Sequence, residues 1–351
     1  MTLVFAVIIY PMKKMYFVVF FIVFSFLSVF CSKLSAESHE IIDSPKFIFP
    51  VGCTQGQDCW AVNYVDVDGV EGAGQDFKCG PKTYDGHKGT DFALGSVAQM
   101  RGGVDVLAAA AGRVQRIRDG QSDRLKTEEE VETLKKDKKE CGNGILIDHG
   151  NGLKSIYCHL KEDSIIVKPK QKIRTGQKIA QVGQSGMAEF PHLHFGVMWE
   201  GGVIDPYTGM LNTQGCGQMK DRMWHVGLPM EYEPVAIFNG GFRSKSPDFE
   251  AIKRGEENPK ALSLGSAAFV FWVGFYNVEQ GDKVVLKIID PDGAIFVERR
   301  EVLKKSRARQ YYFTGRKIGR VQLKAGRYVG HVKIERANGV IREQEFPVSV
   351  R

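Results

Sequence analysis

The segment GNGILIDHGNGLKSIYCHL occupies residues 142–160 and gives the clearest structural signal in this sequence. Two apolar runs, residues 144–149 and 153–159, flank a Gly-Asn-Gly turn at residues 150–152. Runs of this kind around such a turn are typical of an antiparallel β-hairpin. The segment therefore predicts that the surrounding chain folds as antiparallel β-structure.

Short apolar segments separated by glycine-rich turns continue on both sides of this hairpin, between residues 49 and 207. Examples are residues 104–109, 112–118, 145–148, 155–160, 178–182 and 192–198. Their alternation and spacing indicate an antiparallel β domain. Residues 122–140 differ, because they are rich in Glu and Lys and contain no Gly or Pro. This composition predicts an exposed helix, or a partly disordered insertion, between two strands.

A second series of strands is expected from about residue 233. The expected strands are residues 267–276, 283–290, 294–299, 310–313, 319–324, 326–334 and 340–350. About seven short strands over this length predict an immunoglobulin-like β-sandwich. This region lacks a cluster of catalytic residue types, so we expect an accessory or docking module. The mainly β chain would then consist of a first domain at residues 37–232 and a second at 233–351.

The N-terminus resembles a secretory signal. Residues 16–30 are aromatic, aliphatic or Ser, and Lys13 and Lys14 precede them. A basic start, an apolar run and a following small residue predict a signal peptide over residues 1–36. The run is shorter than the roughly 20 residues of a spanning helix, although an uncleaved anchor is an alternative. We expect export to the periplasm or cell envelope, or secretion; the bulky residue before Cys31 disfavours lipidation there.

The cysteine count agrees with export. Removal of the leader leaves six cysteines, and an even number in an exported chain suggests disulfides. If Asp148 faces Asn151 in the hairpin, Cys141 faces Cys158, because facing residues keep a constant index sum. The expected pairs are Cys141–Cys158, Cys53–Cys59 as a short loop and, by elimination, Cys79–Cys216. Free buried thiols are the alternative.

The formal net charge is +7, and residues 301–351 contain 13 Lys and Arg against 4 Glu. A basic face could favour an anionic envelope surface, such as a wall polymer or membrane. The alternative is that these charges lie on the solvated faces of strands. No nucleic-acid motif is present in the sequence, so no nucleic-acid partner is expected. The oligomeric state is not predicted.

Two histidines separated by one residue stand in the motif PHLHFGV at residues 191–197. If this segment is a strand, His192 and His194 share a face, because alternate side chains of a strand point the same way. A buried polar pair needs a partner, since burying it unsatisfied is costly. A metal ion is one such partner, and hydrogen bonds between structural histidines are the alternative.

A histidine and a carboxylate four residues apart stand in HKGTD at residues 87–91. The neighbouring glycines disfavour a helix and predict a loop that enters a strand at residues 90–94. His87 and Asp91, together with the histidine pair, supply the nitrogen and oxygen ligands that zinc prefers. Three such ligands would leave a fourth position open for a reactive water. The sequence therefore predicts a zinc hydrolase, provided that the fold brings these residues together.

A third motif, YCHL at residues 157–160, contains His159 and lies between the other two. HKGTD, YCHL and PHLHFGV, with the hairpin, resemble the M23 peptidases, the lysostaphin-like (LytM-type) zinc endopeptidases that cut peptidoglycan peptides. The resemblance covers residues 80–206. It implies a small antiparallel sheet with one zinc ion per chain in a groove. It assigns the zinc to His87, Asp91 and His194, and catalytic positions outside the ligand set to His159 and His192.

The resemblance implies hydrolysis of peptide bonds in peptidoglycan stems or cross-links by a zinc-activated water. Either catalytic histidine could move the proton, because imidazole titrates in the useful range. Asn63, Tyr64 and Tyr84 could border the groove. Two alternatives are a non-catalytic wall-binding or amidase-activating module, and a peptidase that acts on exported proteins.

Overall fold

The computed structural model describes residues 45–228, 230, 232–233, 235–253, 258–319, 322–337, 339 and 341–351. The expected signal peptide at residues 1–36 and the cysteine at position 31 lie outside this range. Within it, no helix is both long and apolar enough to cross a membrane.

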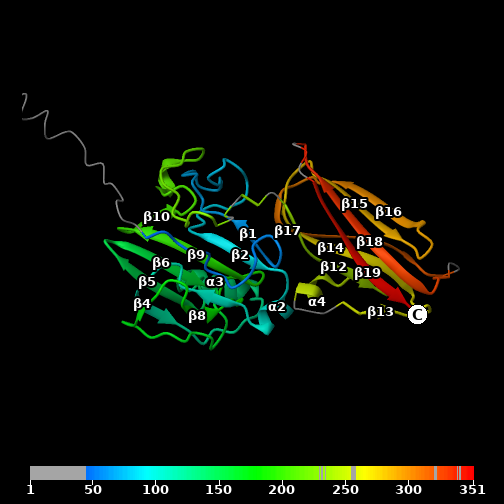
Figure 1. The fold of residues 1–351 in the computed structure, drawn as a ribbon, viewed down its shortest axis with the longest axis horizontal. Helices are drawn as coiled ribbons and strands as arrows, with labels where there is room; N and C mark the ends of the chain where they lie inside the picture. The colour runs from blue at the N-terminus through cyan, green and yellow to red at the C-terminus, as the bar shows by residue number, and fades with distance from the viewer. Residues whose placement is uncertain are drawn as a thin grey trace, which may run out of the picture. The chain divides into compact units, whose positions relative to one another are not determined.

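An antiparallel sheet organises the first part of the chain (Figure 1). Its strands are β1 (Cys59–Asn63), β2 (Thr90–Leu94), β4 (Gly112–Arg118), β5 (Gly144–Gly150), β6 (Leu153–Cys158), β7 (Lys172–Ile173), β9 (His192–Trp199), β10 (Gly202–Asp205) and β11 (Met210–Leu211). The order across the sheet is β1-β2-β9-β6-β5-β4-β7, and β10 joins β9 to β11. Strands β3 (Asp105–Leu107) and β8 (Lys178–Gln181) pair separately. Because β2, β9 and β6 are neighbours, three segments far apart in the sequence meet side by side.

The hairpin of β5 and β6 forms as expected, but its predicted register is wrong. Asp148 faces Lys154 instead of Asn151, and a register shift follows Asp148. All three residues of the Gly-Asn-Gly turn have positive φ. The register shift beside this turn adds an extra residue to one strand, as in a β-bulge. A side chain on Gly144 would come within 2.7 Å of the Cys141 sulfur. The glycine therefore leaves room for Cys141 to fold back onto β6.

Disulfides join all three expected cysteine pairs, so this prediction is confirmed. They are Cys53–Cys59, Cys79–Cys216 and Cys141–Cys158. Cys79–Cys216 ties together segments 137 residues apart. Cys141–Cys158 closes the base of the hairpin that ends at β6.

The charged insertion contains the exposed helix that its composition predicts. Helix α3 (Glu128–Lys136) buries none of its residues. It begins with a capping box, in which the Thr127 hydroxyl accepts from the Glu130 N–H and the Glu130 carboxylate accepts from the Thr127 N–H. The helix is shorter than the segment at residues 122–140. The other helices are α2 (Val97–Gly102), α4 (Phe249–Lys253) and the 3-10 turn η1 (Asn212–Gln214).

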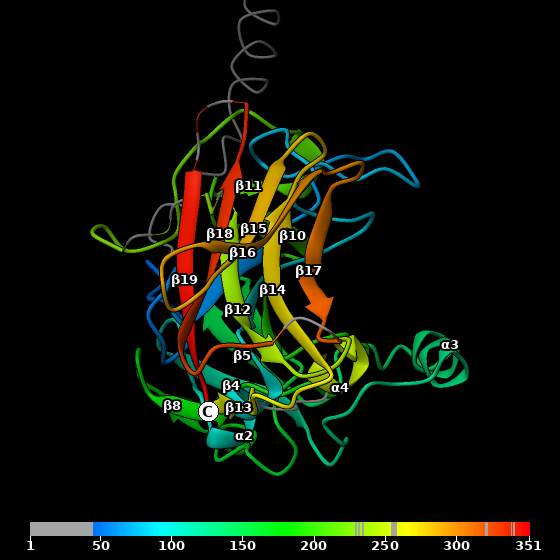
Figure 2. The ribbon, with the colours of Figure 1, turned by 90° about the vertical axis from the view of Figure 1, so that its right-hand side faces the viewer.

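Two sheets enclose a core in the last part of the chain (Figure 2). One contains β12 (Ala236–Arg243), β14 (Ala268–Val278) and β17 (Arg307–Lys317) in this order. The other has the order β13 (Ala261–Leu262), β19 (Ile341–Val350), β18 (Gly326–Glu335), β15 (Lys283–Ile289) and β16 (Ile295–Val302). The mainly β, antiparallel fold class is confirmed, and this strand order is compatible with an immunoglobulin-like sandwich.

Two details of these sheets differ from the sequence prediction. The strand expected at residues 319–324 is not formed at its described residues, 319 and 322–324. Strand β12 was not expected, because two adjacent glycines, Gly240 and Gly241, interrupt its apolar pattern. A Cβ on Gly240 would lie 2.8 Å from the Phe346 ring, so the glycine permits close packing onto the opposite sheet.

A buried aromatic core joins the two parts of Pro45–Arg351, which form one compact unit. The members of this core, which we call the shared core, are Trp60, Val62, Ala93, Phe190, Ala236, Phe238 and Tyr276. The Tyr276 hydroxyl of β14 donates to the Leu94 carbonyl of β2, at 2.8 Å. Asn277 Nδ2 donates to the Ala61 carbonyl of β1, at 2.9 Å. We propose that the chain divides into two domains near residue 233. The two parts pack against each other through the shared core.

Candidate metal centre

Three potential metal-binding atoms converge where β2 pairs with β9. Asp91 faces His194 across this pair, and His87 lies in the loop that enters β2. His87 Nε2, Asp91 Oδ1 and His194 Nδ1 lie 2.9–3.1 Å from one another. Tetrahedral zinc with ligands at about 2.0–2.1 Å would hold them about 3.3 Å apart, so a small outward movement suits the ion. Two imidazoles and one carboxylate are a donor set that fits zinc with a fourth position left open.

Two of the candidate ligands, His87 and Asp91, each form a hydrogen bond through their second polar atom. His87 Nδ1 lies 2.7 Å from the Tyr64 carbonyl, to which its N–H donates, and this leaves Nε2 to bind a metal. Asn63 Nδ2 donates to Asp91 Oδ2 at 2.9 Å. A Cβ on Gly89 would lie 2.6 Å from His194 Nε2, which explains the glycine within HKGTD. Such orienting contacts fix the direction of each ligand before a metal binds.

His159 and His192 lie beside the triad with their rings 4.6 Å apart. His159 Nδ1 donates to the Ser185 carbonyl and His192 Nδ1 to the Phe190 carbonyl, each at 2.8 Å. His192 Nε2 is 3.7 Å from Asp91 Oδ1. The Nε2 of His159 is therefore unprotonated and can accept a proton.

Burial and mutual proximity set the charges of this cluster. Burial lowers the pKa of His159 well below its usual range, and His192 and His194 lower it further. Burial alone would raise the pKa of Asp91, but His87 and His192 outweigh it and hold this pKa well below its usual range. The site thus pairs an ionised carboxylate with histidines, one of them neutral, as metal binding requires.

The pKa of the two histidine ligands shifts in opposite directions. Burial lowers the pKa of His194. Burial also acts against protonation of His87, but Asp91 outweighs it, and the pKa of His87 is raised. A metal ion must displace this proton, so metal binding to the site weakens as the pH falls.

The structure brings together all five residues selected from the sequence: His87, Asp91, His159, His192 and His194. Tyr84 also borders the site, since its ring lies 4.5 Å from that of His87 and the residue is 49% exposed. Tyr64 does not, because its side chain is fully buried among other aromatic rings. Sequence reasoning missed the backbone carbonyls that orient three histidines, and no side-chain pattern could have identified them.

Residues 85–206, which contain every member of the cluster, match the family model for Peptidase family M23. This segment is an M23 peptidase domain. The M23 domain includes β2 through β9 and ends just after β10. Its family and its His-Asp-His cluster together support a metal site.

Three curated relatives are similar to part of this chain. Peptidoglycan DD-endopeptidase ShyB of Vibrio cholerae is 42% identical over 64 residues, 18% of this chain and 15% of its own length. DD-carboxypeptidase/endopeptidase Mpg of Neisseria meningitidis is 30% identical over 115 residues, 33% of this chain and 24% of its own. Murein hydrolase activator NlpD of Salmonella dublin is 35% identical over 65 residues, 18% of this chain and 16% of its own. The chain thus spans under a quarter of each of these relatives.

Proposed function

We propose that this protein is an exported zinc endopeptidase that hydrolyses peptide bonds in peptidoglycan stems or cross-links. The observation that carries the proposal is the convergence of His87, Asp91 and His194 within 3.1 Å of one another, beside two further histidines. Peptidoglycan-acting relatives of the M23 domain support the substrate class. Three disulfides support export, because such bonds persist in oxidising compartments.

The proposed roles follow from the positions of the side chains. His87, Asp91 and His194 would hold one zinc ion. When bound, the ion lowers the pKa of a coordinated water and polarises the scissile carbonyl. The rings of His159 and His192 lie 4.6 Å apart beside the ligands, so either can take a proton from the water and return it to the leaving amine. Hydrogen bonds to the Ser185 and Phe190 carbonyls hold the two rings in place.

Zymography on purified sacculi tests this proposal. The zinc-loaded full chain should clear the sacculi, and a chelator or His87→Ala should abolish clearing. His225→Ala is a matched control, because His225 is exposed and outside the cluster. Absence of clearing by the intact, zinc-loaded protein would contradict the proposal, as would full clearing by the His87 variant.

A second candidate function is activation of another wall hydrolase without catalysis. The similarity to a murein hydrolase activator favours it. The complete His-Asp-His triad weighs against it, because a module without catalysis has no need of an open metal site. Metal content separates the two functions: about one zinc per chain supports the peptidase, and a metal-free purified protein supports the activator. A panel of Gly-rich peptides beside sacculi would reveal a peptidase that acts on exported proteins instead.

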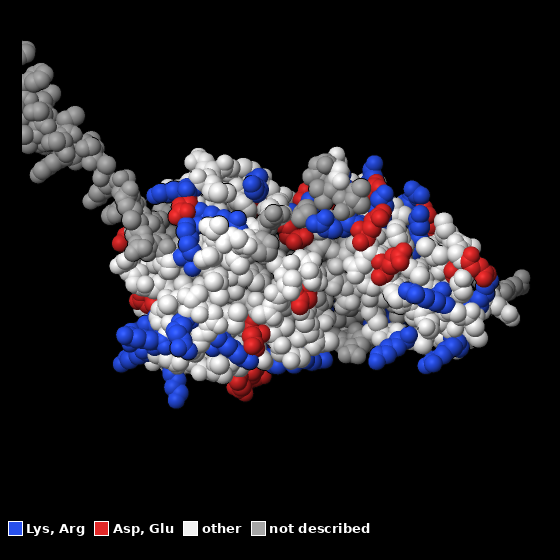
Figure 3. All heavy atoms as spheres, viewed as in Figure 1, with Lys and Arg blue, Asp and Glu red and all other residues white. Residues whose placement is uncertain are grey.

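For the last part of the chain we propose docking to the wall or to another anionic envelope surface. Its positive charge is partly neutralised, since Lys287, Arg300 and Lys324 form ion pairs with acidic residues. In Figure 3, both acidic and basic side chains lie on the visible face of the last part of the chain. Binding to anionic vesicles and to sacculi at rising salt would test the proposal, because contacts of this kind weaken with ionic strength.

A further inference from the structure

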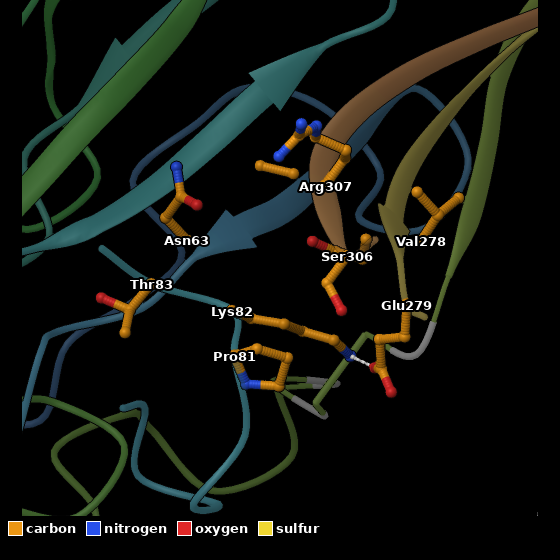
Figure 4. Close-up of a pocket in the computed structure, with 10 residues that line it drawn as sticks. Asn63, Pro81, Lys82, Thr83, Val278, Glu279, Ser306 and Arg307 are labelled. Carbon is orange, nitrogen blue, oxygen red and sulfur yellow. Dashed lines mark ion pairs between the residues drawn. The ribbon is translucent and has the colours of Figure 1, made fainter. Parts of the chain in front are cut away.

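A cavity of about 170 Å³ lies beside the candidate metal centre, between the M23 domain and the last part of the chain. Figure 4 shows Asn63 and Thr83 on one side, and Ser306, Arg307 and Glu279 on the other. Strand β17 begins at Arg307, so the sandwich forms one wall of this cavity.

The wall of the cavity contacts the supports of the metal ligands. Asn63, which lines the cavity, donates to the Asp91 carboxylate. The Thr83 hydroxyl donates to the Tyr64 carbonyl at 2.8 Å, the same carbonyl that accepts the His87 N–H. A group bound in the cavity would therefore touch residues that support two of the metal ligands.

Two of the charged residues in the cavity are already satisfied. Lys82 Nζ donates to the Glu233 carbonyl at 2.6 Å, lies 3.7 Å from the centre of the Tyr232 ring and is 3.8 Å from Glu279. Glu279 also accepts from Arg336. This pair therefore forms a neutral, fixed floor and leaves little charge for a ligand.

Arg307 differs from that pair. It is exposed, lines the cavity, and forms no ion pair with any residue that the structure describes. Beside it, the Ser306 oxygen accepts from the Gln280 N–H, which leaves the hydroxyl hydrogen free to donate. Asn63 uses one of its two amide hydrogens on Asp91 and keeps the other. A guanidinium with neighbouring neutral donors is the arrangement that recognises a carboxylate.

Asn277 also lines the cavity, but its amide oxygen is closed off from it. Asn277 is buried, and its Nδ2 donates to the Ala61 carbonyl. Its Oδ1 is buried without a hydrogen-bond partner. A buried acceptor of this kind is costly unless a ligand or water donates to it. The cation and the neutral donors that line the cavity suit the carboxylate end of a peptide.

We propose that this cavity is a substrate subsite that binds the free carboxylate of a peptide, with Arg307 as its charged partner. The inference rests on the proposed peptidase function and deepens it, because it assigns an acidic substrate group to a named place beside the metal. The sandwich then contributes to substrate choice through β17. A free inorganic anion is the competing occupant that the experiment must exclude.

Binding of muropeptides to the zinc-loaded full chain tests the subsite. The probes are soluble muropeptides from sacculi, either untreated or with their carboxylates amidated, and inorganic phosphate serves as a competitor. The untreated peptides should bind about tenfold or more tightly than the amidated peptides. Arg307→Ala should remove this preference, and Arg307→Lys should retain part of it. Lys317→Ala, an exposed cation at the far end of β17, should leave it unchanged.

The outcomes separate the subsite from the proposed hydrolysis. Equal binding of both peptide forms, or a preference that persists in Arg307→Ala, overturns the subsite whether or not hydrolysis occurs. Complete displacement by phosphate at a concentration similar to that of the peptide also overturns it, since the cavity would then be a simple anion site. An Arg307-dependent preference without hydrolysis supports the subsite and rejects the peptidase. If Arg307→Ala is poorly folded by circular dichroism, Arg307→Gln replaces it.

Discussion

The face of the first sheet that carries the histidines and the face of β14 that lines the sandwich core are both buried, but they are stabilised by opposite means. On β2 and β9, Asp91 and His192 are polar groups, each satisfied by a specific partner. On β14, Phe269, Phe271 and Phe275 are fully buried apolar rings in the sandwich core. Each buried polar group on the first face therefore depends on its hydrogen-bond partner, whereas the second face is stabilised by the packing of apolar rings. The shared core joins them, and Phe190 belongs to both because its ring lies in that core and its carbonyl orients His192.

The largest expected effect is on the polar face. Asp91→Ala removes the only carboxylate of the triad, so hydrolysis of sacculi should fall by about 10⁴-fold and bound zinc should be lost. The measurement is turnover of released peptides together with zinc content. Tyr84→Phe, a change at the rim, is the control and should retain zinc. An Asp91→Ala protein that binds zinc at full stoichiometry would contradict the ligand assignment.

The next effect tests whether the two faces depend on each other through the shared core. Tyr276 stacks on Phe238 with ring centres 4.1 Å apart and donates to the Leu94 carbonyl. Tyr276→Ala should lower the free energy of unfolding by about 3–5 kcal/mol, and Tyr276→Phe by about 1 kcal/mol. Urea unfolding measures both values.

Phe313→Ala is the control for this prediction, since Phe313 is 38% exposed and lies outside the shared core. It should cost about 1 kcal/mol or less. Two separate unfolding transitions, with only the later part of the chain affected by Tyr276→Ala, would show that the two parts fold independently.

The buried carboxyl group of Asp205 differs from that of Asp91, because it lacks surrounding histidines. Burial raises the pKa of Asp205 to about 7. The hydrogen bond that its Oδ1 accepts from the Tyr207 N–H acts in the opposite direction and lowers this pKa. Its Oδ2 has no hydrogen-bond partner. Between its ordinary value of 3.8 and about 7, the native state holds a proton that the unfolded chain releases. Stability should therefore decrease as the pH rises through this window, by at most about 4 kcal/mol.

Asp205→Asn is the test of this pH dependence. The amide does not titrate, so the difference in unfolding free energy between wild type and variant should change across the window from pH 4 to about 7. Unfolding in urea at several pH values gives that difference. A difference that is constant with pH would mean that Asp205 is ionised in the native state, as Asp91 is.

The smallest expected effect is a loss of zinc affinity when Asn63, which donates to Asp91, is replaced. Asn63→Ala leaves the three ligands in place but removes the hydrogen bond to Asp91 Oδ2. Zinc affinity should fall by about 10–100-fold, as is usual when an orienting partner is lost. Competition with a chelator of known affinity measures this. Thr54→Ala, a change in an exposed loop of the same region, should leave the zinc affinity unchanged.

These comparisons also explain which features the sequence could predict. The five residues of the cluster were identified because His, Asp and their spacing carry a chemical signature that is independent of packing. The disulfide between Cys141 and Cys158 was predicted correctly from a register that proved wrong, because Gly144 lets the cysteine fold back.

Other features depend on contacts between distant segments. The shared core was not predicted, since nothing in the local pattern around Tyr276 indicates that it packs on β2. The carbonyls of Tyr64, Ser185 and Phe190 orient histidines, and every residue has a carbonyl, so sequence patterns cannot select these three. Tyr64 itself could have bordered the groove, yet its ring is buried among other aromatic rings.

A mass map of fragments released from purified sacculi by the zinc-loaded full chain tests zinc-dependent hydrolysis at this site. Fragments with newly formed peptide termini are expected, and they should disappear with a chelator and with His194→Ala. Intact peptides throughout, or the same fragments from the chelated protein, would contradict a zinc-dependent peptidase at His87, Asp91 and His194.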